Sequence, residues 1–152
     1  MRERENMRQP FNILVFPFYF EDNNIKYALF KRKDGGYWQA ISGGVEDDES
    51  IIDAAIRESY EEAMIKNDCD FISLDSISSV PATEFKDHLS WGADIYIVKE
   101  NAFGVRVNDK NLIISEEHIS FGWFTYEESI ELLKWDSNKV ALWELNQRLL
   151  NI

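Results

Sequence analysis

Three glutamates near the middle of the chain are spaced so that they share one face of a helix. Glu61 and Glu62 lie three and four positions after Glu58, and side chains at these separations are neighbours on a helix surface. Carboxylates so placed repel one another, so a helix that carries them needs a compensating cation. Mg²⁺ suits this role because it takes oxygen ligands, usually one or two carboxylates together with the phosphates of a substrate. The alternative is an acidic helix face that is simply solvated.

The helix that carries these glutamates has a clear beginning and a clear buried side. Ser50 is placed to cap it, because a serine hydroxyl can accept hydrogen bonds from the N–H groups of the first turn. Small and apolar residues follow at the spacing of a helix packed on a core; they are Ile52, Ala55, Ile56, Ser59 and Ala63. Before Ser50, Gly43, Gly44 and a cluster of acids indicate a loop.

The stretch Gly43–Ile65 resembles the Nudix box, the signature motif of the Nudix hydrolases. The agreement lies in glycine and charged positions, which are Gly43, Glu49, Arg57, Glu58, Glu61 and Glu62. Two positions differ from the motif: Ser59 stands where a bulky aliphatic residue is usual, and Met64 stands where the family has glycine. Neither difference removes a carboxylate, so the resemblance implies a complete metal-binding helix.

The resemblance implies a role for each charged residue of the box. Glu58 and Glu62 would ligate Mg²⁺, for which Mn²⁺ could substitute, and Glu61 would assist on a metal or through a bridging water. Glu49 and Arg57 would form an ion pair that shapes the loop, so Arg57 is not expected to contact phosphate.

A further acid often comes from outside the box in this family. Glu117 is the candidate here, as a third metal ligand or as the general base. On residue type alone, a surface acid in a loop is an equal alternative. We therefore assign Glu61, Glu117, Arg57 and Glu49 to the catalytic set.

Cations that bind the phosphate tail are expected on the strand before the box. Lys31 and Arg32 both lie there, and strand alternation places them on opposite faces, so only one points toward the substrate, with Arg32 favoured. Ser42 can offer its hydroxyl or its N–H to the substrate. Gly43 and Gly44 permit close approach of the backbone to a ligand.

Segments outside the box are similar to a narrower branch, the dATP and dihydroneopterin triphosphate pyrophosphohydrolases. The similar segments include Tyr37–Gly43, with its Trp-Gln pair, and Trp135–Asn138. This similarity implies a nucleotide-like triphosphate that is cut between the α and β phosphorus to release pyrophosphate. Trp38 becomes a candidate for stacking on the ring and Ser137 a candidate substrate contact. A core position for Trp38 and a helix cap at Ser137 are the alternatives.

The rest of the sequence predicts the elements that must position these residues. Runs rich in β-branched and aromatic residues predict strands, at 11–20, 25–31, 37–41, 71–80, 91–99, 103–107 and 121–125. Two late helices are expected over 126–133 and 138–149, the first capped by Thr125. Mixed strands with one central and two late helices indicate an α+β or α/β sandwich. The resemblance sharpens this to the Nudix fold, an α/β/α sandwich with a mixed β-sheet between helices.

Composition limits the partners and the compartment. A chain of 152 residues suits a single domain over 1–152, with residues 1–9 as a loose N-terminal arm. The formal net charge of −12 disfavours polymeric nucleic acid and anionic membranes, whereas a small polyphosphate can arrive as a metal complex. No apolar run approaches the roughly 20 residues of a membrane span and no signal peptide is evident, which indicates a cytoplasmic protein. The tryptophan-rich strands are compatible with a homodimer but do not require one.

Three functions are compatible with these residues. The first is a Mg²⁺-dependent triphosphate pyrophosphohydrolase. The second is an ADP-sugar or dinucleoside polyphosphate hydrolase, which the box does not distinguish from the first. The third is a sensing module that binds a nucleotide without turning it over, and the intact Glu58, Glu61 and Glu62 argue against it.

Overall fold

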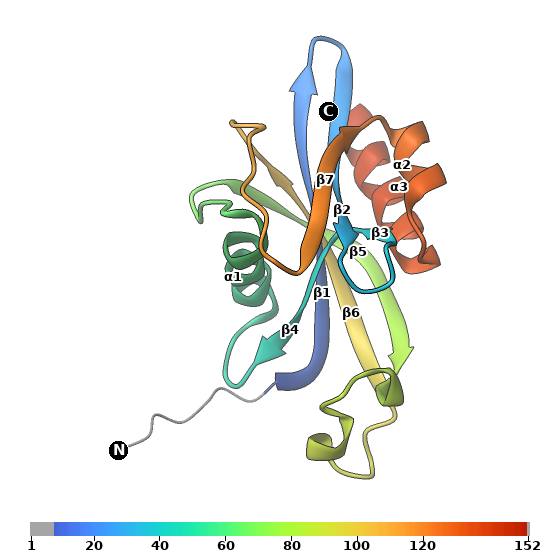
Figure 1. Ribbon diagram of the computed structural model, residues 1–152. Coiled ribbons are helices and arrows are strands. Elements are labelled where there is room, and N and C mark those ends of the chain that lie inside the picture. The colour runs from blue at the N-terminus through green and yellow to red at the C-terminus, as the bar shows by residue number, and fades with distance from the viewer. Residues whose placement is uncertain (1–7, 152) are drawn as a thin grey trace.

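The computed structural model describes residues 8–151, which form a mixed sheet flanked by helices (Figure 1). The strands are β1 (Arg8–Glu21), β2 (Asn24–Arg32), β3 (Trp38–Gln39), β4 (Ile41–Glu46), β5 (Asp70–Pro81), β6 (Ile97–Arg106) and β7 (His118–Phe124). The helices are α1 (Ile51–Ala63), α2 (Tyr126–Leu132) and α3 (Asp136–Leu150), with short 3₁₀ turns at Ala82–Glu84 and His88–Trp91. In Figure 1, α1 lies on one side of the sheet and α2 and α3 on the other, so the predicted α/β/α sandwich is confirmed.

β1 is the strand around which the sheet is assembled. It pairs in parallel with β6 along one edge, and antiparallel with β4 and then β2 along the other. β5 pairs with β6 at one end of the sheet, and β7 pairs with β2. β4 therefore runs beside the first half of β1, which places the glycines of the box near the middle of the molecule.

Two strands are longer than the sequence predicted. β4 continues through Gly43 and Gly44, which were expected in a loop, because Ile13 and Asn12 of β1 pair with them. β6 is one strand, not two separated at residues 100–101, because it pairs with β1 along one edge and β5 along the other. In β6, pairing on both edges holds the polar residues 100–101 in a strand, although their own propensities do not favour one.

Three other boundaries also differ from the prediction. α3 begins at Asp136, so Ser137 lies inside its first turn and does not cap it; the N-cap residue is Trp135, which makes no side-chain capping bond. Trp91 ends a 3₁₀ turn and does not begin a strand. Of the expected arm over residues 1–9, Arg8 and Gln9 are the first residues of β1, and residues 1–7 lie outside the described residues.

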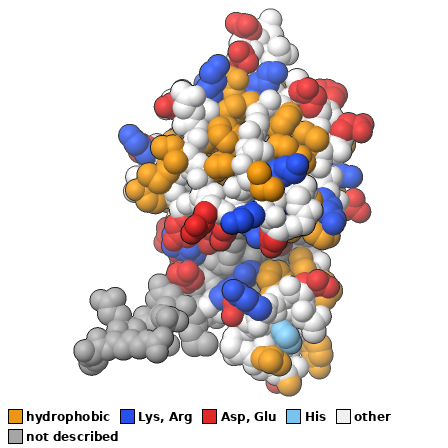
Figure 2. Space-filling view, in the orientation of Figure 1, with side chains coloured by type: hydrophobic (Ala, Val, Ile, Leu, Met, Phe, Trp, Pro, Cys, Tyr) orange, Lys and Arg blue, Asp and Glu red, His pale blue; other side chains and the backbone are white. Residues whose placement is uncertain are grey.

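The surface mixes polar and apolar side chains. Figure 2 shows hydrophobic side chains in the upper part of the face seen in Figure 1, with acidic and basic side chains beside one another below them. Within residues 8–151, no helix is both long enough and apolar enough to cross a membrane.

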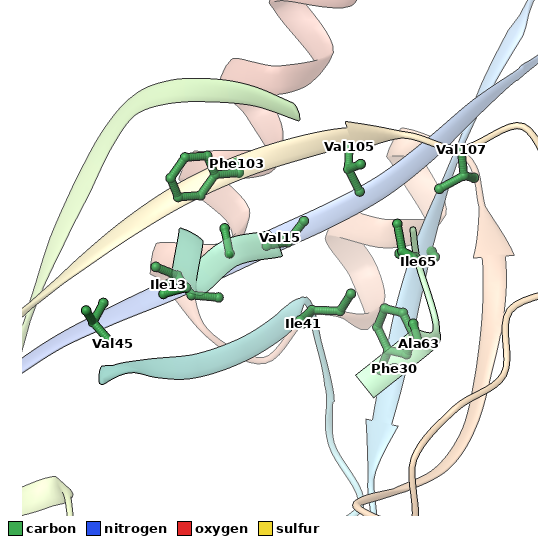
Figure 3. Close-up of a cluster of buried hydrophobic side chains, with 13 residues drawn as sticks. Ile13, Val15, Phe30, Ile41, Val45, Ala63, Ile65, Phe103, Val105 and Val107 are labelled. Atoms are coloured by element: carbon green, nitrogen blue, oxygen red, sulfur yellow. The ribbon is translucent and has the colours of Figure 1, made fainter. Parts of the chain in front are cut away.

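An apolar layer fills the space on each side of the sheet. The layer under α1 gathers side chains from β1, β2, β4 and β6 against the end of the helix (Figure 3). The layer under α3 includes Leu145. Consecutive residues of β1 alternate between the two, with Ile13 and Val15 in the first and Leu14 and Phe16 in the second, as the period of a strand requires. This alternation decides which side of the sheet each polar residue of the site reaches.

α1 begins as predicted and ends at a strained residue. The hydroxyl of Ser50 accepts a hydrogen bond of 3.2 Å from the backbone N–H of Asp53, which confirms the predicted cap. At the other end, Met64 adopts a left-handed backbone with φ 55°. A residue with a Cβ is disfavoured in this conformation, and a glycine is not.

Met64→Gly should therefore raise the free energy of unfolding by roughly 1 kcal/mol. Met64 is 46% exposed, so the loss of its side chain removes little packing. Urea unfolding followed by circular dichroism measures the change. Met64→Ala is the matched control, because it removes the same side-chain atoms beyond Cβ and keeps the Cβ itself. Equal stability of the two variants would contradict backbone strain as the cause.

Candidate active site

α1 approaches the sheet closely because its inner face is built from small residues. Its small buried residues are Ala54, Ala55, Ser59 and Ala63. Short side chains there bring the helix backbone near β1 and β4, against which it packs. The longer carboxylates on the adjoining positions then extend along the sheet: Glu62 is buried, and the side chain of Glu58 is only 15% exposed.

Gly43 makes room for Glu58. A Cβ at Gly43 would lie 2.1 Å from Cδ of Glu58, far inside van der Waals contact. The carboxylate of Glu58 thus lies directly over the backbone of β4 at a position without a side chain. The first glycine of the box is needed for this close approach, since its φ lies outside the positive range that favours glycine.

Glu62 is fixed by His118, which comes from β7. Nε2 of His118 lies 2.9 Å from Oε1 of Glu62, and both side chains are almost fully buried. Burial lowers the pKa of His118, as does the charge of Arg32, so the ring is neutral near pH 7. We assign its proton to Nε2, from which it donates to Glu62. The geometry thus gives this histidine a structural role: it orients a carboxylate.

Burial raises the pKa of both helix carboxyl groups. That of Glu58 rises to about 8, with the nearby carboxyl group of Glu62 as a further cause. That of Glu62 also rises to about 8, with the charges of Glu117 and Glu61 adding to the effect of burial. The two groups titrate as a coupled pair. Without a cation, the pair therefore retains protons near pH 7.

The residues present fit a hard divalent cation. Ligand atoms of Glu62, Glu117 and His118 all lie within 4.8 Å of one another. When Glu58 and Glu62 are both ionised, no hydrogen-bond donor within residues 8–151 reaches the buried Oε2 of Glu62, which is costly for a polar atom. A Mg²⁺ ion held by Glu58 and Glu62 would satisfy that oxygen, because oxygen atoms are the ligands this ion prefers.

Arg57 organises the loop before the helix. It binds both carboxylate oxygens of Glu49, at 2.8 and 3.0 Å, and its Nη2 also donates to the carbonyl oxygen of Gly44 at 2.8 Å. Its Nη1 donates to Glu58 at 2.9 Å and to Glu61 at 3.1 Å. Each guanidinium nitrogen is thus engaged within the protein. The ion pair with Glu49 has the geometry that the resemblance implied.

The structure brings Arg32, and not Lys31, to the carboxylates. Nη1 of Arg32 lies 3.6 Å from Oε2 of Glu117, and its Nε donates to Asp34 at 2.9 Å. Lys31 pairs across the strands with Trp38, so the two side chains share the opposite face of the sheet. Glu61 remains at the rim, with its side chain 54% exposed.

Two predicted substrate residues lie away from the carboxylates. Trp38 packs against the apolar layer under α3, edge-on to Phe124 with 5.4 Å between ring centroids. Ser137 borders a cavity on that same side of the sheet. Ser42 lies between the two regions, on β4, where its Oγ accepts a hydrogen bond of 3.1 Å from Nδ2 of Asn12.

A buried polar network on the α3 side was not predicted. Nδ2 of Asn12 donates to Oε2 of Glu100 at 2.7 Å, and Nη2 of Arg8 donates to Oδ1 of Asn12 at 2.6 Å. A Cβ at Gly44 would lie 2.3 Å from Nε of Arg8, so the second glycine of the box admits this side chain. The only sequence signal was Asn12 itself, a polar residue inside an otherwise apolar strand.

Comparison with known proteins supports the resemblance to the Nudix hydrolases that the sequence indicated. The sequence profile of the NUDIX domain family matches residues 14–143. A Listeria monocytogenes protein of known structure, described as a candidate NUDIX hydrolase, is 40% identical; the match covers 94% of this chain and 96% of that one, with a TM-score of 0.85. The dihydroneopterin triphosphate diphosphatase of Escherichia coli is 27% identical over 137 residues, 89% of this chain and 91% of the relative.

A more distant likeness concerns the fold alone. The structure of the E. coli dihydroneopterin triphosphate pyrophosphohydrolase is 23% identical, with a TM-score of 0.74 over 97% of this chain and 100% of that one. Together with the Listeria structure, it confirms that the mixed sheet between helices is the Nudix fold predicted from the sequence.

The raised pKa values predict how stability depends on pH in the absence of metal. In the unfolded chain Glu58 and Glu62 have an ordinary pKa near 4.5, against about 8 when folded. The folded state therefore binds more protons between these values, and the stability that this contributes is lost as pH rises through that range. We expect the Tm in EDTA to fall from pH 5 to pH 8, and Mg²⁺ to restore it.

The double variant E58Q/E62Q isolates this effect, because an amide does not titrate. Its Tm should change less with pH than that of the wild-type protein. Parallel Tm curves for the two proteins over that range would contradict the assignment of the coupled pair.

Gly43→Ala tests the close approach of Glu58. The added methyl group must displace the carboxylate, so affinity for Mn²⁺ should fall at least about tenfold, measured by electron paramagnetic resonance titration. Ser42→Ala is the control, because the neighbouring side chain lies on the opposite face of β4. Unchanged Mn²⁺ affinity in Gly43→Ala would show that Glu58 is not held over this glycine when metal is bound.

Proposed function

Because the chain belongs to the Nudix domain family, we propose that it is a Mg²⁺-dependent enzyme that hydrolyses a nucleoside or pterin triphosphate to the monophosphate and pyrophosphate. Membership of the family makes it a hydrolase of phosphoanhydride bonds. The names of the bacterial relatives, dihydroneopterin triphosphate diphosphatases, support the triphosphate substrate. Mn²⁺ is the expected substitute for Mg²⁺.

One observation carries this proposal: when Glu58 and Glu62 are both ionised, no donor among the described residues reaches the second oxygen of the buried Glu62. The carboxylate is held in place by His118 through its other oxygen, at 2.9 Å. Ligand atoms of Glu117 and His118 lie within 4.8 Å of one another and of Glu62, and Glu58 lies one turn before Glu62 on α1. A solvated acidic face, the alternative for such a helix, does not bury a carboxylate or supply a histidine to orient it.

Each residue then has a task in the hydrolysis. Glu58 and Glu62 hold the cation, which when bound neutralises phosphate charge and polarises the attacked phosphorus. Glu117, with its side chain 58% exposed, lies at the mouth of the site. It accepts a proton from the attacking water as the water oxygen bonds to the α phosphorus. The bond from that phosphorus to the bridging oxygen breaks, and pyrophosphate leaves with that oxygen.

Arg32 is the cation placed to bind the phosphate tail. Its guanidinium already lies beside Glu117, and within residues 8–151 its one side-chain hydrogen bond goes to the exposed Asp34. Arg57 is unsuited to this task, because Glu49, Gly44, Glu58 and Glu61 occupy its donors. Arg32 therefore has guanidinium N–H donors left for a phosphate group, whereas those of Arg57 are already used within the protein.

A hydrolysis panel with product identification tests the proposed function. The panel contains the common nucleoside triphosphates, dihydroneopterin triphosphate, ADP-ribose and a dinucleoside polyphosphate, each with Mg²⁺ and with EDTA. Monophosphate and pyrophosphate from one triphosphate, only with Mg²⁺, is the expected result. Selective cleavage of ADP-ribose or the dinucleotide would refute the substrate class. Tight nucleotide binding without any turnover would identify a sensor.

Glu62→Gln should lower turnover at least about a hundredfold and leave the fold intact. The amide keeps the shape of the side chain and loses the charge that holds the cation. Steady-state kinetics at saturating Mg²⁺ measures the loss, with circular dichroism as the check on folding. Glu131→Gln, at an exposed acid on α2, is the control for removing one negative charge. Wild-type turnover in Glu62→Gln would refute the metal assignment.

A further inference from the structure

A cavity of about 320 Å³ opens on the α3 side of the sheet, beside the first turn of that helix. Leu14 of β1 and Ala102 of β6 are cross-strand neighbours in its apolar wall. Polar side chains of Ser78, Glu100 and Ser137 border it. Ligand pockets in proteins start at about 300 Å³, so this cavity is large enough for a planar bicyclic ring.

Glu100 is held rigidly at the edge of this cavity. It is only 8% exposed, and both of its carboxylate oxygens accept hydrogen bonds. Oε2 accepts from Nδ2 of Asn12 at 2.7 Å, and Oε1 accepts from the hydroxyl of Ser78 at 3.1 Å. A carboxylate has about four lone-pair positions, so each oxygen can accept one more hydrogen bond. The group thus offers two acceptor oxygens, each already fixed by one hydrogen bond.

The charge of the cavity indicates which part of a substrate it can hold. Asp136 joins Glu100 in its lining, and no Lys or Arg within residues 8–151 contributes to it. Like charge disfavours phosphate groups there. Amino and ring N–H groups are matched to it, because they donate to carboxylates.

β4 joins this cavity to the carboxylates of α1. Asn12 donates both to Glu100 and to Ser42, and the next residue, Gly43, lies under Glu58. Successive residues of a strand face opposite sides, so only this strand separates the cavity side from the metal side. Within the described part of the chain, β4 pairs with β1 alone, so no further strand lies along its outer edge.

We propose that Glu100 selects the ring of the substrate by accepting hydrogen bonds from two adjacent N–H donors, the edge that a 2-amino-4-oxopyrimidine presents in guanine and in pterins. This inference rests on the proposed triphosphate hydrolysis and names the ring that it requires. Adenine and cytosine place a ring-nitrogen acceptor beside their amino group, and an acceptor that faces a carboxylate is repelled. Asn12 is a positioning residue, because its amide holds Glu100 and is itself held by Arg8.

Hydrolysis of the paired substrates GTP and ITP supplies the first test of ring selection by Glu100. GTP and ITP differ only in the 2-amino group, so kcat/KM of the wild-type enzyme should be at least about tenfold higher for GTP. Dihydroneopterin triphosphate, which presents the same edge, should group with GTP, and ATP with ITP. Glu100→Gln puts an amide donor in place of one acceptor, so the ratio of GTP to ITP should fall close to one. Glu131→Gln, on the exposed face of α2, should keep the wild-type ratio.

Binding of the monophosphates separates this inference from the proposed function. Isothermal titration calorimetry should show that GMP binds at least about tenfold more tightly than IMP. The same preference in a protein that hydrolyses no triphosphate would keep the ring selection and refute the function. Hydrolysis of GTP and ITP with equal kcat/KM would overturn the ring selection and keep the function. If Glu100→Gln does not fold, the comparison of GTP with ITP on the wild-type enzyme decides the question.

Discussion

The close approach of Glu58 to the backbone of β4 is the constraint on which the rest of the site depends. The carboxylate can lie there only because Gly43 has no side chain and because small residues let α1 pack tightly on the sheet. Arg57 then ties the helix to the strand by donating to the carbonyl oxygen of Gly44 as well as to Glu58. Helix, strand and loop are thereby fixed relative to one another, and the remaining carboxylates take their positions from this arrangement.

The site concentrates negative charge that the protein itself neutralises only in part. Arg57 pairs with the acids on the outer side of α1, and it also binds both carboxylate oxygens of Glu49 in the loop before the helix. Glu62 lies deeper and receives a single hydrogen bond from a neutral histidine. Burial, and the charge of neighbouring carboxyl groups, raise the pKa of both Glu58 and Glu62. A divalent cation would supply the positive charge that the ionised pair lacks.

The sequence predicted what depends on short separations along the chain. The cap at Ser50 follows from the local sequence, the resemblance to the Nudix box implied the ion pair between Glu49 and Arg57, and both are present. The continuation of β4 and β6 depends on pairing with strands distant in sequence, which local propensity does not contain. Asn12 and Glu100 are 88 residues apart, so their contact arises only from the parallel pairing of β1 with β6. The roles of Glu117 and Arg32 remain predictions, although the structure places both beside the helix carboxylates.

In the proposed function, the metal site and the ring site lie on opposite sides of β4. On the side of α1, the positions are constrained by one another, since a change at Gly43 displaces Glu58 and a change at Glu58 removes a partner of Arg57. On the side of α3, Glu100 accepts hydrogen bonds from Asn12 and from Ser78. These contacts are made by strand residues and not by the glutamates of the helix. A fold of this kind can keep its phosphoanhydride chemistry while its ring specificity changes, because the two depend on opposite faces of a single strand.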